Sequence, residues 1–383
     1  MARLEEICSL ITDGSHFSPE DEGVGYPMFS VKDMTPNGFN ISGCKKIGEE
    51  AYKKLVANGC KPLNDDVVVA KDGSYLKTAF VIKGNPEIAL LSSIAILRPK
   101  IDLVVPEYLS YFLKSDAVYR TVSLNYITGT ALKRIILKGI RKIEVDLPDI
   151  GEQEQRAQRL SKVDYLCQLR KQQLDKLDEL VKARFVEMFE NSSWPNTSLN
   201  DICSEIVDCP HSTPKYEGNL EHPAIRTTEI KKGYIDWDSM KYVSEEEYQK
   251  RIKSLKPVPG DIVYGREGTY GNAAIIPDGY EFCLGQRVML FRPNKTKCIS
   301  AYVLYAILSD RVKRQADEKN VGATVPHVNV ADAKQFDVVL PPLELQNQFA
   351  AFVERVYRQK QTVQQSLEKL ELMKKALMQE YFG

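Results

Sequence analysis

Residues 4–16 read LEEICSLITDGSH, and residues 199–211 read LNDICSEIVDCPH. When the two stretches are aligned, Leu, Ile-Cys-Ser, a second Ile, Asp and His recur at the same spacing. The offset is the 195 positions that separate Leu4 from Leu199. Similarity at a fixed offset is the signature of an internal repeat, and it constrains the architecture more than any short motif does.

The match continues in the same order along the chain. Shared positions at the first offset are Lys61-Pro62 with Lys256-Pro257, Asp66 with Asp261, Gly73 with Gly268 and Tyr75 with Tyr270. The offset then drifts by one or two positions, as small loop deletions would make it: Arg98-Pro99 matches Arg292-Pro293, Ser115-Asp116 matches Ser309-Asp310, and Leu147-Pro148 matches Leu340-Pro341. The sequence is therefore one unit written twice.

Each repeat has the same plan. About 145 residues mix β-type runs, such as residues 66–70 (DVVVA) and 261–264 (DIVY), with glycine-rich turns and one or two helical segments. Each repeat then closes with Leu-Pro and a long stretch almost free of glycine and proline. The predicted division is a first globular domain at residues 1–148, a helical spacer at 149–192, a second globular domain at 193–341, and a second helical spacer at 342–383.

The two closing stretches carry residues at steps of seven, as in a coiled coil. The rows of the first are Leu160, Cys167, Leu174, Val181, Met188 and Val163, Arg170, Leu177, Arg184. The rows of the second are Val353, Lys360, Leu367, Lys374, Tyr381 and Val356, Val363, Leu370, Leu377. The charged members would snorkel or mark register rather than abolish pairing.

The simplest partner for one long helix is the other, in antiparallel orientation. About 36 residues at ~1.5 Å each give a rod on the order of 50 Å, which would hold the two domains apart at a fixed distance. The predicted fold class is therefore α+β, with two tandem-repeat α/β domains separated by two long antiparallel helices that form a coiled coil.

Composition gives little support for a specific activity. The 383 residues include 52 basic and 52 acidic residues, so any nucleic-acid site must be a local basic patch. No charged leader with an apolar run opens the sequence, and no stretch of ~18 apolar residues could span a membrane. The eight cysteines include no Cys-x-x-Cys pair, so we expect reduced thiols in a cytoplasmic protein without a metal site.

Motifs for chemistry are missing from the sequence. No phosphate-binding glycine loop, nucleophile elbow, zinc-protease motif or methyl-transfer signature is present. Asp278 and Asp317 could be interpreted as the acids of a metal-dependent nuclease site, but Asp278 is better explained as part of a turn. The equivalent His16 and His211 admit two main interpretations, a structural hydrogen bond to the preceding Asp of the turn or a contact to phosphate or base.

Several turns concentrate basic, aromatic and amide groups that could touch nucleic acid, because Arg and Lys neutralise phosphates and Arg and Gln pair with base edges. Any one of them is explained slightly better as solvated loop charge, but the set recurs in both repeats. The candidate DNA-binding residues are His16, Lys32, Lys71, Tyr75, Lys77, Thr130, Lys133 and Arg134 in the first repeat, and His211, Arg226, Thr227, Arg266, Tyr270, Gln286, Arg287, Thr324 and His327 in the second. Two domains that share a fold but differ in their loop side chains are what we expect if each domain binds a different DNA sequence.

At this point the chain resembles the specificity subunits of type I restriction-modification enzymes over essentially its whole length. The resemblance rests on Asp13-Gly14-Ser15-His16 with residues 208–214 (DCPHSTP), on Gly129-Thr130-Ala131 with residues 322–329 (GATVPHVN), and on residues 340–348 (LPPLELQNQ) leading into the final helix. The first repeat departs from this pattern at residues 147–151 (LPDIG) and 132–134 (LKR), which weakens residue-level transfer there.

The resemblance implies a division of labour. Each globular domain would be a target-recognition domain reading one half of a bipartite site in double-stranded DNA. The helical spacers would set the gap and bind two methyltransferase subunits, and a restriction subunit that translocates DNA would join them. S-adenosylmethionine, ATP and Mg²⁺ would be bound by those partners, so this chain would hold no cofactor or metal and would not be an enzyme.

Two alternatives stay open at this stage. A coiled-coil scaffold with two protein-binding domains would have a cleaner seam, and its loops need not be basic. A nuclease or methyltransferase acting by itself would have to turn over DNA with magnesium or S-adenosylmethionine, and it lacks motif support.

Overall fold

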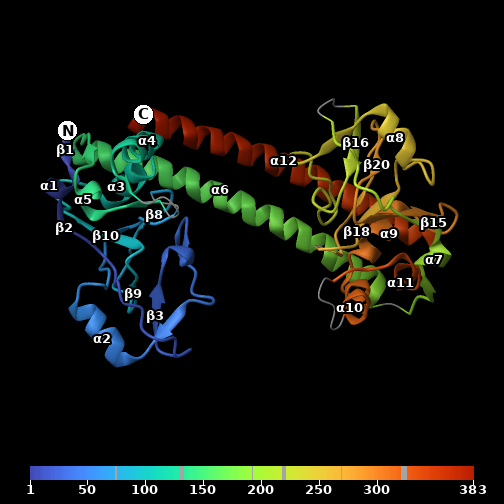
Figure 1. The fold of residues 1–383 in the computed structure, drawn as a ribbon, viewed down its shortest axis with the longest axis horizontal. Helices are drawn as coiled ribbons and strands as arrows, with labels where there is room; N and C mark the ends of the chain where they lie inside the picture. The colour runs from blue at the N-terminus through green and yellow to red at the C-terminus, as the bar shows by residue number, and fades with distance from the viewer. Residues whose placement is uncertain (74–75, 129–132, 192, 218–220, 269, 321–325) are drawn as a thin grey trace. The chain divides into compact units, whose positions relative to one another are not determined.

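The computed structural model describes every residue except 74–75, 129–132, 192, 218–220, 269 and 321–325. The chain forms two compact units (Figure 1). Unit 1 holds residues 1–171 and 365–383, and unit 2 holds residues 172–364. Two long helices, α6 (Ile150–Phe185) and α12 (Leu343–Phe382), each contribute one segment to unit 1 and one to unit 2.

Unit 1 is built on a four-stranded antiparallel sheet of order β2-β10-β7-β8. Its strands are β2 (Cys8–Asp13), β10 (Ile94–Pro99), β7 (Val67–Ala70) and β8 (Ala79–Val81). A second sheet joins β6 (Lys45–Ile47), β3 (Tyr26–Phe29) and β9 (Ala89–Leu90), with β3 parallel to β9. The remaining elements are β1 (Ala2–Arg3), α1 (Leu4–Ile7), β4 (Met34–Thr35), β5 (Gly38–Phe39), α2 (Glu49–Ala57), α3 (Pro106–Leu113), α4 (Asp116–Asn125), β11 (Ile127–Thr128), β12 (Arg134–Ile135), α5 (Leu137–Arg141), β13 (Glu144–Val145) and a 3₁₀ turn at Val31–Asp33.

Unit 2 repeats the two larger sheets of unit 1 in the same strand order. Its main sheet has the order β15-β21-β18-β19, from β15 (Cys203–Asp208), β21 (Val288–Pro293), β18 (Ile262–Gly265) and β19 (Ala273–Ile275). The second sheet joins β17 (Lys241–Val243), β16 (His222–Ile225) and β20 (Cys283–Leu284), again with one parallel pair. The remaining elements are a π-helical turn at Val186–Glu190, β14 (Asn196–Ser198), α7 (Leu199–Ile202), α8 (Glu245–Arg251), α9 (Ser300–Ile307), α10 (Asp310–Lys319), α11 (Val330–Lys334) and β22 (Asp337–Val339).

The register of the two main sheets is also repeated. Leu97 pairs with Ile11 in unit 1, and Phe291 pairs with Ile206 in unit 2. Each first strand has an irregularity next to its cysteine, which pairs with the proline that ends the neighbouring strand. The duplication predicted from the sequence is therefore confirmed at the level of hydrogen-bonded partners.

A buried carboxylate is paired with arginine at the same place in each sheet. Asp66 is fully buried, and Arg98 Nε donates to it over 2.8 Å. Asp261 is 1% exposed, and Arg292 Nε donates to it over 2.9 Å. Each carboxylate also accepts a backbone N–H three residues before it, so its charge is compensated on two sides. These recurring Asp and Arg residues are explained by folding and need no role in DNA recognition.

A buried glutamine attaches each long helix to its domain. The amide of Gln153 on α6 accepts from Val105 N and donates to the carbonyls of Leu103 and Pro148. Gln346 on α12 makes the same three bonds, to Ile299 N and to the carbonyls of Lys297 and Pro341. Both side chains are within 1% of complete burial. The three bonds satisfy backbone groups that would otherwise be buried without a partner.

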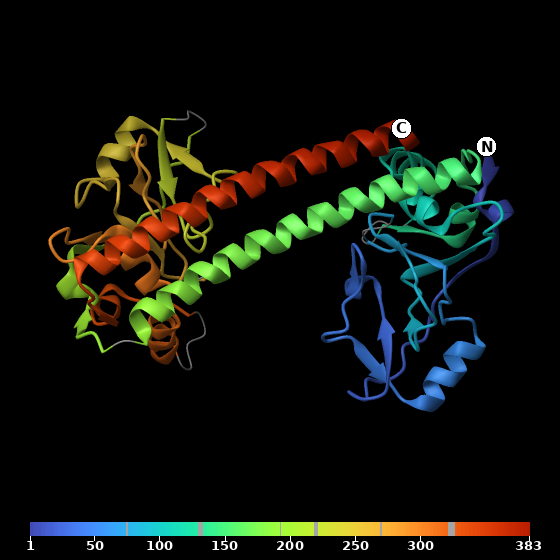
Figure 2. The ribbon, with the colours of Figure 1, turned by 180° about the vertical axis from the view of Figure 1, so that it is seen from behind.

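Within each unit, α6 and α12 pair in antiparallel fashion, as predicted (Figure 2). In unit 1, Arg156 donates to the carbonyl of Tyr381 near one end of the pair, and Arg170 donates to Ser366 further along. In unit 2, Lys360 of the predicted seam donates to Asp178 over 2.5 Å. The apolar seam members that are buried include Leu160, Val163, Cys167, Val181, Val356, Val363 and Leu367. The predicted fold class is confirmed.

Among the described residues, no helix is long and apolar enough to cross a membrane. All eight cysteines are free and buried. Burial raises the pKa of the Cys8 thiol to about 12 and that of Cys298 to about 11, so these thiols are held in the neutral form.

Candidate nucleic-acid interface

In unit 1, the first strand of the main sheet ends at an acid, and a cation and an imidazole gather around it. Asp13 closes β2, and Lys71 follows β7 two strands away in the sheet. The ammonium of Lys71 contacts the Asp13 carboxylate, and both side chains are about nine-tenths buried. His16 Nε2 lies 3.6 Å from the same carboxylate, while its side chain is 79% exposed.

Unit 2 carries the same triplet at the equivalent strand ends. Asp208 closes β15, Arg266 follows β18 with its Nε 3.2 Å from Asp208, and His211 Nε2 lies 3.7 Å away. The side chain of Arg266 is 13% exposed, whereas that of His211 is 78% exposed. We call Asp13, His16 and Lys71, and Asp208, His211 and Arg266, the strand-end triplets.

The geometry of the triplets distinguishes the two interpretations of His16 and His211, a structural hydrogen bond to Asp or a contact to DNA. A separation of 3.6–3.7 Å is too long for a hydrogen bond, so the turn is not closed by an Asp–His bond in either unit. The imidazole rings are instead presented to solvent next to a buried ion pair. Contact of these rings with phosphate or base stays a prediction.

The loops predicted to act together do meet in each unit. In unit 1, Gly73 N donates to the carbonyl of Lys133 over 2.9 Å, and Arg134 Nε lies 3.7 Å from Asp72. In unit 2, Val328 N donates to the carbonyl of Arg266 over 2.9 Å, and Glu267 forms a β-bridge with His327. The side chains of Lys133, Arg134 and His327 are exposed. Each strand-end triplet is therefore bordered by an exposed basic segment from the far end of its domain.

Unit 2 has a further feature at Gln286 and Arg287. Arg287 adopts φ +62°, a left-handed conformation that bulky residues rarely adopt. Its carbonyl accepts from Arg266 N over 2.9 Å, which ties the strained residue to the triplet. Its side chain is 64% exposed, and its only described ion pair is with Glu267 at 3.1 Å. Gln286 donates to Thr213 Oγ1 over 2.7 Å, so it braces the loop that carries His211.

Other predicted residues are engaged in internal contacts. The guanidinium of Arg226 clamps the fully buried Glu229, and Thr227 beside it is half-buried. The phenol of Tyr270 donates to Asp317, a bond that raises the pKa of Tyr270. Lys32 and Lys77 are exposed and lie apart from the triplet contacts given above. Tyr75, Thr130 and Thr324 lie outside the described residues.

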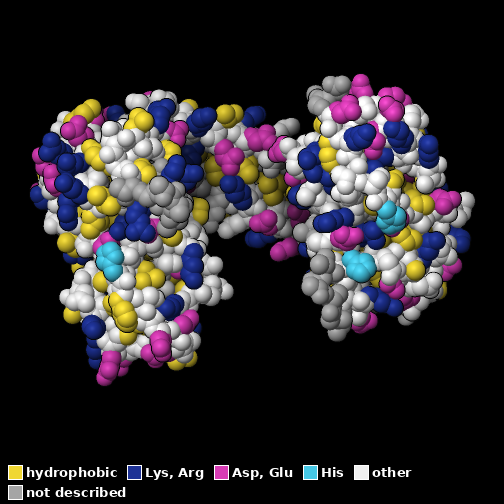
Figure 3. Space-filling view, in the orientation of Figure 1, with side chains coloured by type: hydrophobic (Ala, Val, Ile, Leu, Met, Phe, Trp, Pro, Cys, Tyr) yellow, Lys and Arg dark blue, Asp and Glu magenta, His cyan; other side chains and the backbone are white. Residues whose placement is uncertain are grey.

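Sequence reasoning missed the acidic partners. Asp13, Asp208 and Glu267 position the cations of the interface, although the predicted DNA-binding residues included no acids. The signal was available for the first two, because both aspartates recur in the duplicated opening stretch. In Figure 3 the surface of unit 2 shows histidine side chains with Lys and Arg close by, and magenta acids interspersed. Exposed cations such as Lys133 and Arg134 are therefore placed locally on a chain that has no net charge.

The model of the family described as "Type I restriction modification DNA specificity domain" matches residues 1–179 and again residues 191–372. The chain belongs to this family. It is a DNA-recognition subunit of a type I restriction-modification system and not one of the catalytic subunits, and its partners are DNA and other members of that complex.

Individual relatives agree with this assignment. The putative type I restriction enzyme MjaX specificity subunit of Methanocaldococcus jannaschii is 22% identical over 403 aligned positions, which cover 98% of this chain and 90% of that protein. The MjaVIII specificity subunit of the same organism is 23% identical, covering 85% of this chain and 79% of its own length.

Solved structures show the same fold. The S subunit of a type I restriction-modification system from M. genitalium aligns over all of this chain and 95% of its own, with a TM-score of 0.58 at 13% identity. A chain from a structural study of type I restriction-modification assembly aligns with a TM-score of 0.56 at 17% identity, covering 100% of this chain and 96% of that one.

Proposed function

We propose that this specificity subunit reads a bipartite site in double-stranded DNA, one half with each unit. The observation that carries this proposal is the pair of strand-end triplets, which occupy equivalent positions and are bordered by different side chains. Unit 1 surrounds its triplet with Ser92-Ser93, Lys133 and Arg134, while unit 2 has Gln286, Arg287 and His327. Two equivalent frames with different base-contacting groups would recognise two different half-sites.

Within each unit, buried and exposed residues would have different roles in binding the half-site. The buried Lys71 and Arg266 hold the end of the sheet together through their aspartates, and they would contribute positive potential more than direct contact. The exposed His16, His211, Lys133, Arg134, Arg287 and His327 would touch phosphates or base edges. Arg226 and Tyr270 would support the loops from inside, since their polar groups already have partners.

The proposal extends to the assembly. Two methyltransferase subunits would dock on the chain, and a restriction subunit would complete the complex. S-adenosylmethionine, ATP and Mg²⁺ would be bound by those subunits, which would flip and methylate the target adenine. We propose the cytoplasm as the compartment, which fits the eight free thiols.

The test is co-expression with the methyltransferase subunit of the same system, followed by mapping of N6-methyladenine across the host DNA. The expected result is one split motif, with two short half-sites around a fixed gap of unspecified bases. Methylation without a split motif would contradict the two-reader proposal. A complex that forms but binds DNA with an affinity insensitive to salt would contradict phosphate contact, because such contacts make binding fall steeply with salt.

A further inference from the structure

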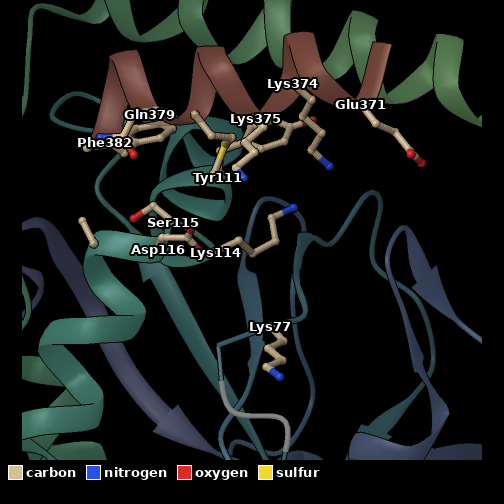
Figure 4. Close-up of a pocket in the computed structure, with 13 residues that line it drawn as sticks. Lys77, Tyr111, Lys114, Ser115, Asp116, Glu371, Lys374, Lys375, Gln379 and Phe382 are labelled. Carbon is tan, nitrogen blue, oxygen red and sulfur yellow. The ribbon is translucent and has the colours of Figure 1, made fainter. Parts of the chain in front are cut away.

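Unit 1 contains a cavity of about 350 Å³ that the proposed DNA interface does not use. Its walls come from the junction of α3 and α4, from the last turns of α12 and from Lys77 before β8. Four of the lining side chains are lysines, namely Lys77, Lys114, Lys374 and Lys375, against two acids, Asp116 and Glu371. Figure 4 shows Lys114 and Lys374 extending into this space from opposite walls.

Comparison with unit 2 shows that two of these lysines replace an apolar pair. Lys114 immediately precedes the helix-capping Ser115, and Leu308 precedes the equivalent cap, Ser309. Lys374 follows Leu367 by seven positions, as Val181 follows Leu174. In unit 2, Val181 is buried in the core cluster against which Leu308 packs. Unit 1 therefore has two ammonium groups where the same fold elsewhere has hydrophobic contact.

Charge in the cavity is poorly compensated by the protein. Lys374 is paired with Asp164 at 2.5 Å, and Glu371 is paired with Lys171. No described carboxylate lies within ion-pair distance of Lys77, Lys114 or Lys375. Lys114 lies 4.5 Å from the centre of the Tyr111 ring. Burial, followed by the charge of Lys374, lowers the pKa of Lys114 to about 8, so an added anion would relieve an existing strain.

We propose that this cavity binds a phosphate group. Lysine side chains from three separate segments line it, those of Lys114 and Lys374 extend into it, and lysine binds phosphate as a compact point charge. The phosphate could belong to a free anion such as phosphate, pyrophosphate or a nucleotide, or to the DNA backbone beside the first half-site. The DNA source rests on the proposed function, because it requires Lys77 and the neighbouring loop at residues 71–73 to face the duplex. Binding of a free anion does not depend on the proposed function.

The test uses the full chain in complex with its methyltransferase subunit. The variant Lys114→Leu/Lys374→Val installs the apolar residues of unit 2, and its thermal midpoint is measured first, because the change also removes the ion-pair partner of Asp164. Lys114→Gln/Lys374→Gln is a second variant that removes charge without adding apolar surface. Lys54→Leu, which removes an exposed lysine from α2, is the matched control.

Two measurements distinguish a free anion from a DNA backbone phosphate. In the first, equilibrium binding of radiolabelled phosphate and pyrophosphate and of ATP is measured, and one saturable site that weakens at least tenfold in both double variants supports a free anion. In the second, DNA affinity is measured against salt, and a slope of log K against log salt that falls by about 1 supports a backbone phosphate. The proposal is overturned if the double variants change neither anion binding nor the salt slope. Failure of the parent complex to bind DNA would instead contradict the proposed function and leave the first measurement decisive.

Discussion

Arg287 lies at the proposed DNA interface and has an unusual backbone conformation. It combines a left-handed backbone with a side chain that is 64% exposed and beside the triplet of unit 2. Strain of this kind costs about 1–2 kcal/mol for a residue with a side chain, and it persists where the surrounding structure over-determines it. We predict that Arg287 pairs bidentately with a base edge, preferably guanine.

The magnitudes follow from these contacts. Arg287→Ala removes one bidentate pair, worth about 1–3 kcal/mol, so discrimination at one base pair of the second half-site should fall about 5- to 150-fold. Its ion pair with Glu267 is exposed and worth less than about 1 kcal/mol, so stability should change little. Arg287→Gly should lose the same discrimination but be about 1 kcal/mol more stable than Arg287→Ala, because glycine adopts φ +62° without strain.

The assay is competitive binding of the methyltransferase complex to duplexes that carry each base pair in turn across both half-sites, with thermal unfolding of the same proteins. Arg287→Lys separates charge from geometry, since it should keep overall affinity and lose discrimination. Arg314→Ala, an exposed arginine on α10, is the control. The reasoning is refuted if Arg287→Ala leaves every preference in the second half-site intact, or if Arg287→Gly is no more stable than Arg287→Ala.

Three other predictions follow from buried groups. Gln346→Ala should lower the free energy of unfolding in urea by about 1–3 kcal/mol, because three backbone groups lose their partner, whereas the exposed Gln348→Ala should stay within about 0.5 kcal/mol; equal effects would contradict the anchoring role. Because the pKa of Lys114 is about 8 in the folded chain against an ordinary 10.5, the unfolded state binds more protons between these values. Stability should therefore rise with pH across that window in the parent and not in Lys114→Leu, as pH-dependent unfolding would show. None of the eight buried thiols should react with Ellman's reagent before unfolding, and rapid reaction of native protein would contradict their burial.

The large features of the fold could be predicted from the sequence because they are repeated. One duplicated stretch identified two copies of a sheet whose registers agree, and steps of seven identified both long helices. Even the charged seam positions behaved as expected, since Arg170 and Lys360 reach partners on the facing helix. Periodicity is a property of many residues at once, so it tolerates exceptions.

The details of the interface could not be predicted in the same way. Whether an arginine side chain is available to DNA depends on its neighbours in space. Arg226 and Arg287 both lie in polar loop segments of the sequence, but Arg226 binds the buried Glu229 whereas Arg287 is exposed. The left-handed conformation of Arg287 had no signal, because glycine or asparagine would be the residues expected there. Lys114 has no signal in the sequence for a similar reason, since only the comparison with Leu308 shows that the equivalent position in the other repeat is apolar.

Domain exchange tests the central claim most directly. Residues 1–145 would be replaced by the corresponding segment of another specificity subunit whose methylation motif is known, and N6-methyladenine would be mapped after co-expression with the methyltransferase. The account predicts that one half-site changes to that of the donor, while the other half-site and the gap stay the same. A change in both half-sites, or in neither, would contradict the claim that each unit reads one half of the DNA site by itself.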